Sequence, residues 1–240
     1  MNLLLFDPME LTGDTLTLAD RRAHHLRTVL GVRIGDSIRA GEVGGRTGSA
    51  QILTDDGSAY TLRIALDGPP SRPLDIDLVL AVPRPKVITR TLEIAASFAV
   101  RSIELTNAWK VDKAYLRSPR LDPQALALAA RFGAEQGATT HIPQITVHDR
   151  LMALLDAKFS APDGLRLIAH PGAPPLERAV TRSEPTTLAI GPEGGWIERE
   201  VETFVARGFT PVSLGAPILR VEAAVASALG QLLLLQRLRS

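Results

Sequence analysis

The sequence contains no cysteine, few aromatic residues and no long apolar segment. Without cysteine, the chain has no disulfide, no thiol nucleophile and no thiolate metal site. The opening stretch MNLLLFDPME lacks the basic start and the long apolar core of a secretory signal. No uninterrupted apolar run reaches the length of about 18 residues that a membrane span needs. We therefore expect a cytoplasmic protein that is not inserted in a membrane.

The chain also lacks a strong charge of either sign, with 27 Lys and Arg residues against 26 Asp and Glu residues and a formal net charge of +1. A markedly basic chain would be the usual sign of a nucleic-acid partner, so the overall charge does not indicate one. Basic residues do cluster between Arg21 and Arg46, and again between Trp109 and Arg120, where aromatic residues are interleaved. Each cluster is compatible with a solvated face or with an RNA-binding surface.

A metal site is not indicated either. The histidines stand at positions 24, 25, 141, 148 and 170, and their spacing matches no pattern of metal ligands. We expect no bound metal ion.

The pattern of the sequence changes near residue 70. Before it, short segments alternate polar with apolar residues and are separated by glycine pairs, which predicts a small β-barrel or sheet. Helical spacing occurs there only from Asp20 to Leu30. Pro69, Pro70 and Pro73 form a stiff connector. We predict a first domain over residues 1–70 and a second over residues 74–240.

In the second domain, apolar strand-like runs alternate with segments of helical period, which predicts an α/β fold with a parallel sheet. Asp122 followed by Pro123 is typical of a helix start. The last helix, from about Glu222 to Leu238, is apolar over more than one face. This breadth indicates burial in the core or against a second subunit.

Two glycine-containing segments of this domain carry most of the functional information. They are LAIGPEGGW, from Leu188 to Trp196, and SLGAPILRVEAA, from Ser213 to Ala224. Each is associated with a short apolar run that predicts a buried parallel strand. We expect the two strands to be adjacent and to end at one edge of the sheet, where α/β proteins bind ligands. We also predict that Arg220 and Glu222 form a buried acid–base pair in this pocket.

The glycines alone do not identify the ligand. GPEGG lacks the Lys-Ser/Thr of a Walker phosphate loop, and it does not have the spacing GxGxxG of dinucleotide-binding turns. By spacing alone it fits a tight structural turn as well as a ligand loop.

Both segments resemble the signature of SPOUT-type RNA methyltransferases that methylate ring nitrogen N3 of a uridine in small-subunit (16S) ribosomal RNA. Further stretches are similar to that family: AHHLRTVLGVRIGDSI (Ala23 to Ile38), AEQGATTHIP (Ala134 to Pro143) and the sequence Ala169-His170-Pro171. The resemblance runs nearly from end to end. It implies a PUA-like β-barrel that binds RNA, followed by a SPOUT domain with a deep trefoil knot, a homodimer, and 16S rRNA or the small ribosomal subunit as partner.

The resemblance also implies S-adenosylmethionine as the methyl donor. Backbone groups of the two glycine turns would then contact the adenine edge, and apolar side chains would cover its faces. Glu193 would cap the following helix or hold the ribose hydroxyls. The residues expected to bind the donor are His170, Ile190, Gly191, Glu193, Gly194, Gly195, Leu214, Gly215, Ile218 and Leu219.

The catalytic residues implied by the resemblance are Arg220 and Glu222. Methylation at N3 requires loss of the N3 proton, and a fixed guanidinium would stabilise the resulting negative charge. Glu222 would orient Arg220 or act as the base. The alternative is a salt bridge that only closes the knot.

An RNA-binding surface is expected at basic residues in both domains. His24 and His25 would contact RNA or would merely begin a helix. The full set expected to contact RNA is His24, His25, Arg27, Arg33, Arg84, Lys86, Lys110 and Lys113.

The chain departs from the family pattern at several positions. Ser97 and Thr139 stand where an acidic and a basic residue are usual, and the last motif has Pro217 and Val221 in place of its usual residues. The identity of the target nucleotide therefore stays open. Two alternative functions are compatible with the sequence. One is methylation of a different RNA nucleotide, and the other is a non-catalytic role in RNA binding or ribosome assembly.

Overall fold

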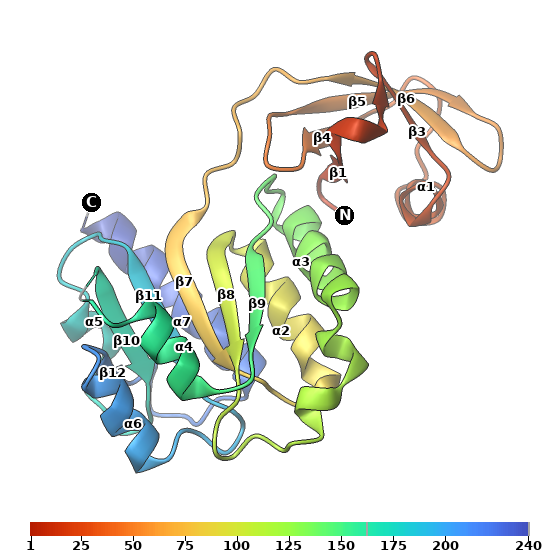
Figure 1. Cartoon of the computed structure of the whole chain (residues 1–240). Coiled ribbons are helices and arrows are strands. Elements are labelled where there is room, and N and C mark those ends of the chain that lie inside the picture. Colours follow the sequence, from red (N-terminus) through yellow and green to blue (C-terminus); the bar gives the residue numbers. More distant parts are fainter. Residues whose placement is uncertain (162, 240) are drawn as a thin grey trace. The chain divides into compact units, whose positions relative to one another are not determined.

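The structure, a computed structural model, describes residues 1–161 and 163–239. The chain divides into two compact units. The first comprises Met1–Arg72 together with Arg131–Ile142, and the second comprises Pro73–Ala130 together with Pro143–Ser240 (Figure 1). The first unit therefore combines the chain up to Arg72 with a segment from much later in the sequence.

A six-stranded sheet forms the first unit, with strand order β1-β4-β5-β6-β3-β2. β1 and β4 are parallel, and the other pairs are antiparallel. Its strands are β1 (Leu4–Phe6), β2 (Leu11–Thr12), β3 (Thr15–Leu18), β4 (Ser37–Glu42), β5 (Thr47–Asp55) and β6 (Tyr60–Ala65). In β6 the side chains alternate, so that Tyr60, Leu62 and Ile64 are buried in the core of this unit.

A short helix follows β3. Asp20 caps α1 (Arg21–His25) by accepting a hydrogen bond from the backbone of Arg22, and one π-helical turn continues it over Leu26–Leu30. Gly31, at φ +60°, ends this turn in the left-handed conformation that glycine adopts easily.

Residues 131–142 join the first unit through specific contacts. Ala134 packs with Leu3 and Leu5, and the carboxylate of Glu135 forms an ion pair with Arg21 at 2.7 Å. The sequence alone predicts this segment in the second domain, because local periodicity carries no information on contacts so distant along the chain.

The second unit confirms the predicted α/β class with a parallel sheet. Its six strands run in the order β12-β10-β11-β7-β8-β9, and each neighbouring pair is parallel. They are β7 (Leu74–Ala81), β8 (Val100–Thr106), β9 (Gln144–His148), β10 (Leu165–Ala169), β11 (Thr186–Ile190) and β12 (Thr210–Val212). The helices are α2 (Pro85–Ser97), α4 (Leu151–Lys158), α5 (Leu176–Ala179), α6 (Glu198–Val205) and α7 (Val221–Leu238), together with the first part of α3 (Pro123–Gly137), whose residues from Arg131 onward belong to the first unit.

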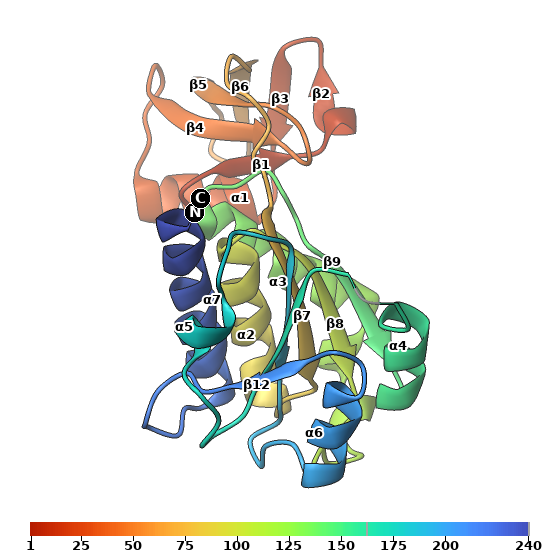
Figure 2. The ribbon, with the colours of Figure 1, turned by 90° about the vertical axis from the view of Figure 1, so that its left-hand side faces the viewer.

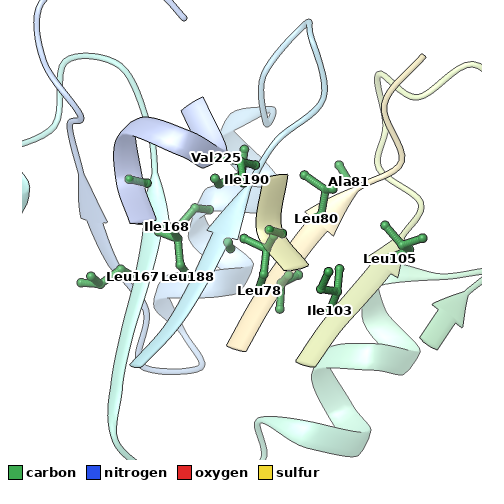
Figure 3. Packing of buried hydrophobic residues seen from close by; sticks show 14 of the residues in the cluster. Leu78, Leu80, Ala81, Ile103, Leu105, Leu167, Ile168, Leu188, Ile190 and Val225 are labelled. Atoms are coloured by element: carbon green, nitrogen blue, oxygen red, sulfur yellow. The ribbon is translucent and has the colours of Figure 1, made fainter. Parts of the chain in front are cut away.

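The helices cover both faces of this sheet. α2 and α7 lie side by side on one face, and α4 and α6 lie on the other (Figure 2). Central strands of such a sheet are buried on both faces and are apolar throughout, as in β11, which is buried over its whole length. Leu78, Leu188 and Val225 meet in the resulting core, which extends along β7, β8, β10 and β11 (Figure 3).

α7 is long and apolar enough to cross a membrane by length and composition alone. Its inner side chains, Val225, Ala228, Leu229 and Leu232, are fully buried in the protein core. Leu234 and Leu238, by contrast, are exposed near its end. The helix therefore has the burial of a core helix on one side and an uncovered apolar strip on the other.

The two strands that precede the glycine-containing segments are not adjacent, which corrects the sequence-based expectation. β10 lies between β11 and β12 and pairs with both. The last residues of three parallel strands therefore define the edge of the sheet at which the two segments meet.

Candidate functional site

A cavity of about 280 Å³ opens at the carboxyl edge of the parallel sheet, where β10, β11 and β12 end. Binding clefts of open α/β sheets occur at this edge. All the residues predicted to bind the methyl donor line this one cavity: His170, Ile190, Gly191, Glu193, Gly194, Gly195, Leu214, Gly215, Ile218 and Leu219. The sequence-based prediction thus selected residues that the fold brings together from three separate loops.

The first wall of the cavity is the turn after β11. Gly195 has φ +69°, a conformation that other residues adopt only with strain, and its N–H donates to the carbonyl of Pro192 at 2.7 Å. This bond occupies the N–H of Gly195, so a ligand would contact this residue through its carbonyl. A side chain on Gly191 would place its Cβ 3.1 Å from the backbone nitrogen of Trp196, a tight contact that favours glycine there.

The second wall is the segment after β12. Gly215 has φ +138°, and its N–H donates to the hydroxyl of Ser213 at 3.2 Å. The carbonyl of Leu214 accepts a hydrogen bond from the side chain of Gln231, on α7, at 3.0 Å. The contact with α7 therefore fixes this segment. It also occupies one of the two acceptor positions on the carbonyl oxygen of Leu214.

His170 stands between the two walls, at the end of β10. Its N–H donates to the carbonyl of Val212 at 2.9 Å, and its carbonyl accepts from Ala173. Because β10 lies between β11 and β12, the residue that follows it, His170, also lines the cavity.

The cavity suits the methyl donor that the family resemblance implies. Ile218 is 86% exposed and Leu219 is 37% exposed at its mouth, so apolar side chains stand ready to cover a flat ring. The indole N–H of Trp196 is buried in the cavity wall without a hydrogen-bond partner among the described residues. Bare glycine backbone next to apolar side chains is what an adenosyl group requires.

Arg220 and Glu222 do not form the buried pair that the sequence predicted. Arg220 is exposed, and Glu222 is half-buried. No hydrogen bond or ion pair joins the two side chains in the described part of the chain. The reason is local: Arg220 is the N-cap residue of α7 and has extended backbone, whereas Glu222 belongs to the first helical turn. Both nevertheless flank Val221, which lines the cavity.

The carboxylate of Glu193 makes a contact that the sequence did not predict. Its carboxylate accepts a hydrogen bond from the backbone N–H of Arg84 at 3.0 Å, which holds the loop after β7 against the glycine turn. The N-terminus of α6 is instead capped by Glu200, whose carboxylate accepts the N–H of Ile197 at 3.0 Å.

Basic residues predicted to bind RNA surround this turn in the second unit. The ammonium group of Lys110 donates to the carbonyl of Gly194 at 2.7 Å. The guanidinium of Arg84 lies 3.9 Å from the Glu193 carboxylate. Lys86 and Lys113 are exposed. The fold therefore brings Arg84 and Lys110 to the glycine turn.

The basic residues predicted in the first unit are engaged in local contacts. Arg27 forms an ion pair with Asp55 at 2.7 Å and lies over the ring of Tyr60. Burial, together with the positive N-terminal amine of Met1, lowers the pKa of His25, so its ring is neutral near pH 7. His24 and Arg33 are more open, since both are exposed.

A second cavity, of about 220 Å³, lies at the opposite, amino-terminal part of the sheet. Its charged groups are largely paired with one another, as in the ion pairs of Arg101 with Asp77 and of Lys158 with Glu104. Burial alone would raise the pKa of Asp77, but the hydrogen bonds from Arg101 and Ser102 outweigh it and lower that pKa. We interpret this cavity as a structural ion-pair cluster.

Sequence reasoning did not select several residues of the site, and three of them have a clear structural part in it. Trp196 lines the cavity, Glu200 holds the loop after β8, and Trp109 lies exposed in that loop. Trp196 ends the glycine motif and could have been included on that ground. Glu200 gives no sequence signal, because it acts on a loop about ninety residues earlier in the chain. Within the described residues, no group of three or more acidic or histidine side chains is placed to hold a metal ion.

Comparison with known proteins places this geometry in context. The family model described as an RNA methyltransferase domain matches residues 70–233. The chain is 29% identical to ribosomal RNA small subunit methyltransferase E of Treponema pallidum, over 95% of this chain and 89% of the relative. A relative of the same name from Synechocystis is 27% identical, over 95% of this chain and 76% of its own length.

A solved structure shares the fold along almost the whole chain. It is a ribosomal RNA small subunit methyltransferase E from Neisseria gonorrhoeae, bound to S-adenosyl methionine. The similarity has a TM-score of 0.77 and covers 98% of each chain, with 23% sequence identity.

Proposed function

Because the chain belongs to the RNA methyltransferase domain family, we propose that it methylates ring nitrogen N3 of a uridine in 16S ribosomal RNA, with S-adenosylmethionine as donor. The observation that carries this proposal is the single cavity at the carboxyl edge of the sheet. Two curated relatives that match nearly the whole chain are named for the same substrate class.

The donor would lie between the two glycine-containing segments. Gly191 and the carbonyl of Gly195 provide bare backbone, while Ile190, Ile218 and Leu219 cover the adenine. The sulfonium of the bound donor supplies the methyl group. In this proposal, the cavity residues orient that group toward the acceptor and exclude water from it.

Arg220 would stabilise the negative charge that the uracil ring acquires when N3 loses its proton. Its guanidinium is exposed beside Leu219, so it is free to contact an incoming base. Glu222, on the first turn of α7, would accept the N3 proton directly or through water. The absence of an ion pair between the two side chains supports separate roles for them.

We propose that the first unit is a PUA-like barrel that binds RNA. Its antiparallel strand pairs and the exposed His24 support this role. Cytoplasmic location, expected from the sequence, agrees with a ribosomal substrate.

We further propose a trefoil knot around the cavity and a homodimer formed through α7. The knot is supported by contacts of the segment after β12 with two other parts of the chain. Pro174 accepts the N–H of Ser213, and Gln231 donates to Leu214. The exposed Leu234 and Leu238 support the dimer. Leu234→Glu should shift the sedimentation coefficient to that of a monomer, and an unchanged dimer would exclude this face.

Two measurements test the function. Calorimetric titration with S-adenosylmethionine should show a single site per chain, and absence of heat would favour a non-catalytic RNA-binding protein. Primer extension on 16S rRNA from a deletion strain should lose one stop, because N3 methylation blocks Watson–Crick pairing. Complementation with the unaltered gene should restore this stop, and with Arg220→Ala should not. A stop that persists after deletion would exclude the proposed target.

A further inference from the structure

The loop after β8 presents the indole of Trp109 to solvent. This side chain is 79% exposed, and no other aromatic ring in the described chain is comparably open. An exposed tryptophan does not contribute the large stabilising free energy that burial of an aromatic side chain provides. Such exposure is typical of a side chain that a ligand covers.

The exposure does not result from a loose loop. The backbone N–H of Trp109 donates to the carboxylate of Glu200 at 2.7 Å, and Val111 donates to the carbonyl of Ala108 at 3.0 Å. Ala108 and Val111 are themselves buried in the core. The indole is therefore held outward by a fixed backbone, which reduces the entropy lost when a ligand binds to it.

Trp109 lies beside the proposed methyl-transfer site. Its neighbour Lys110 donates to the carbonyl of Gly194, a residue that lines the donor cavity. The contact is close along the side chain too, because a Cβ on Gly194 would lie 2.9 Å from Cδ of Lys110. An aromatic surface is thus attached directly to the wall of the cavity.

The charges around the indole suit an RNA strand. Lys113 is an exposed basic residue of this loop, Arg84 is one of the loop that Glu193 holds, and Lys86 is one on the first turn of α2. The nearby acids are occupied by backbone N–H groups: Glu193 by Arg84, Glu200 by Trp109 and Ile197, and Asp112 by Ala114. Cations next to an exposed aromatic ring are the combination that binds single-stranded nucleic acid.

We propose that Trp109 is a stacking platform for an unpaired nucleobase of the RNA substrate, next to the donor cavity. This inference rests on the proposed function in one respect, namely that the substrate is RNA. The ring would stack on the face of a base, and the neighbouring lysines would contact its phosphates.

Tryptophan fluorescence tests the platform directly, because the chain has two tryptophans and only Trp109 is exposed. Trp196 is 4% exposed and should stay shielded. A short single-stranded oligouridylate is the probe, and an abasic strand with the same number of phosphates is its control. Oligouridylate should quench the red-shifted Trp109 emission, and the abasic strand should bind weakly without quenching it.

Two substitutions separate ring stacking from simple apolar contact. Trp109→Leu keeps an apolar side chain without a ring, and should weaken oligouridylate binding by about 5- to 150-fold. Trp109→Phe keeps a ring and should retain most of the affinity. Neither should alter the affinity for the abasic strand. In both variants the remaining emission of Trp196 reports whether the second unit is folded.

The proposed stacking role of Trp109 is wrong if oligouridylate binds without quenching the Trp109 emission. It is also wrong if the Trp109→Leu variant binds oligouridylate as tightly as the unaltered protein does. Failure of the proposed function has a different signature. In that case rRNA would stay unmethylated, although oligouridylate would still quench Trp109 and the leucine variant would still lose affinity. If methylation is found, Trp109→Leu should raise the KM for RNA much more than it lowers kcat.

Discussion

The ammonium group of Lys110 lies 2.7 Å from the carbonyl oxygen of Gly194, which ties the loop after β8 to the glycine turn after β11. A residue expected from sequence to contact RNA thus also supports the wall of the donor cavity. The donor cavity and the basic residues around it are therefore connected, and a substitution in the basic loop should also change the affinity for the donor.

Lys110→Met should reduce both RNA affinity and donor affinity. Loss of a charge-assisted hydrogen bond costs about 1.5 kcal/mol, so we expect the donor to bind roughly tenfold more weakly. Lys113→Met is the matched control, since it removes the same charge from an exposed position three residues later. It should lower RNA affinity alone. Equal donor affinities in the two variants, measured by calorimetry, would show that Lys110 does not support the turn.

Gly195→Ala should weaken donor binding by about tenfold or more. Its φ of +69° makes alanine strained by about 1 kcal/mol, and the added methyl group meets no protein atom within 4 Å, so it projects into open space. Gly208→Ala provides the comparison, because Gly208 also has positive φ, at +81°, and equally open surroundings after α6. Both substitutions should lower the midpoint of urea unfolding by a similar amount, but only Gly195→Ala should reduce the affinity for the donor.

Arg220→Ala should lower kcat for methyl transfer by about 100-fold or more, as removal of a group that stabilises developing charge does. Because the side chain is exposed and caps nothing, stability should change by less than about 0.5 kcal/mol. Donor affinity should stay within about tenfold. Arg220→Lys should recover part of the activity. Full turnover by the alanine variant would remove Arg220 from the mechanism.

Acid should destabilise the first unit through Arg22, which is buried between Glu10 and Asp20. Burial by itself would raise the pKa of both carboxyls, but the hydrogen bonds from Arg22 outweigh it and lower each below its ordinary value of 4.5 or 3.8. A carboxyl whose pKa is lowered on folding contributes stability above its unfolded pKa. That contribution should therefore begin to be lost near pH 4.5 and should fall further as the pH drops through the two lowered values.

Arg22→Met removes this contribution and should cost about 2 kcal/mol at neutral pH. Arg63→Met is the control, because Arg63 and Asp14 form an exposed pair at 3.6 Å that should contribute less than about 0.5 kcal/mol. In urea unfolding, the gap between the Arg22 variant and the unaltered protein should narrow as the pH falls from about 6 to about 3. A gap that is constant with pH would mean that packing, and not charge, accounts for the loss.

Much of the second unit could be predicted from local patterns. Thr186–Ile190 and Leu165–Ala169 are short apolar runs bounded by turn residues, and the strands have these limits in the structure. The helix of Leu151–Lys158 was not predicted, because its apolar residues have no clear one-sided spacing in so short a segment. The three-residue strand Leu4–Phe6 is too short to show alternation.

The remaining differences concern contacts between distant parts of the chain. Periodicity predicts a strand over Pro211–Leu214, close to β12, but it does not place β10 between that strand and β11. Arg220 and Glu222 are two residues apart in sequence, yet the start of α7 between them sends their side chains to different surroundings. The residues predicted to bind the donor line one cavity, and they could be grouped from the sequence only because the resemblance supplied a grouping that no local pattern contains.

The position of β10 between β11 and β12 has a consequence for biosynthesis. The cavity needs three parallel strands to pair in an order that differs from their order of synthesis, and such long-range pairing is slow. One of the contacts that fix its second wall comes from Gln231, far along α7. A ribosome-bound nascent chain therefore lacks this part of the donor site until it has been translated through Gln231, so the methylating site is completed only after most of the polypeptide has been synthesised.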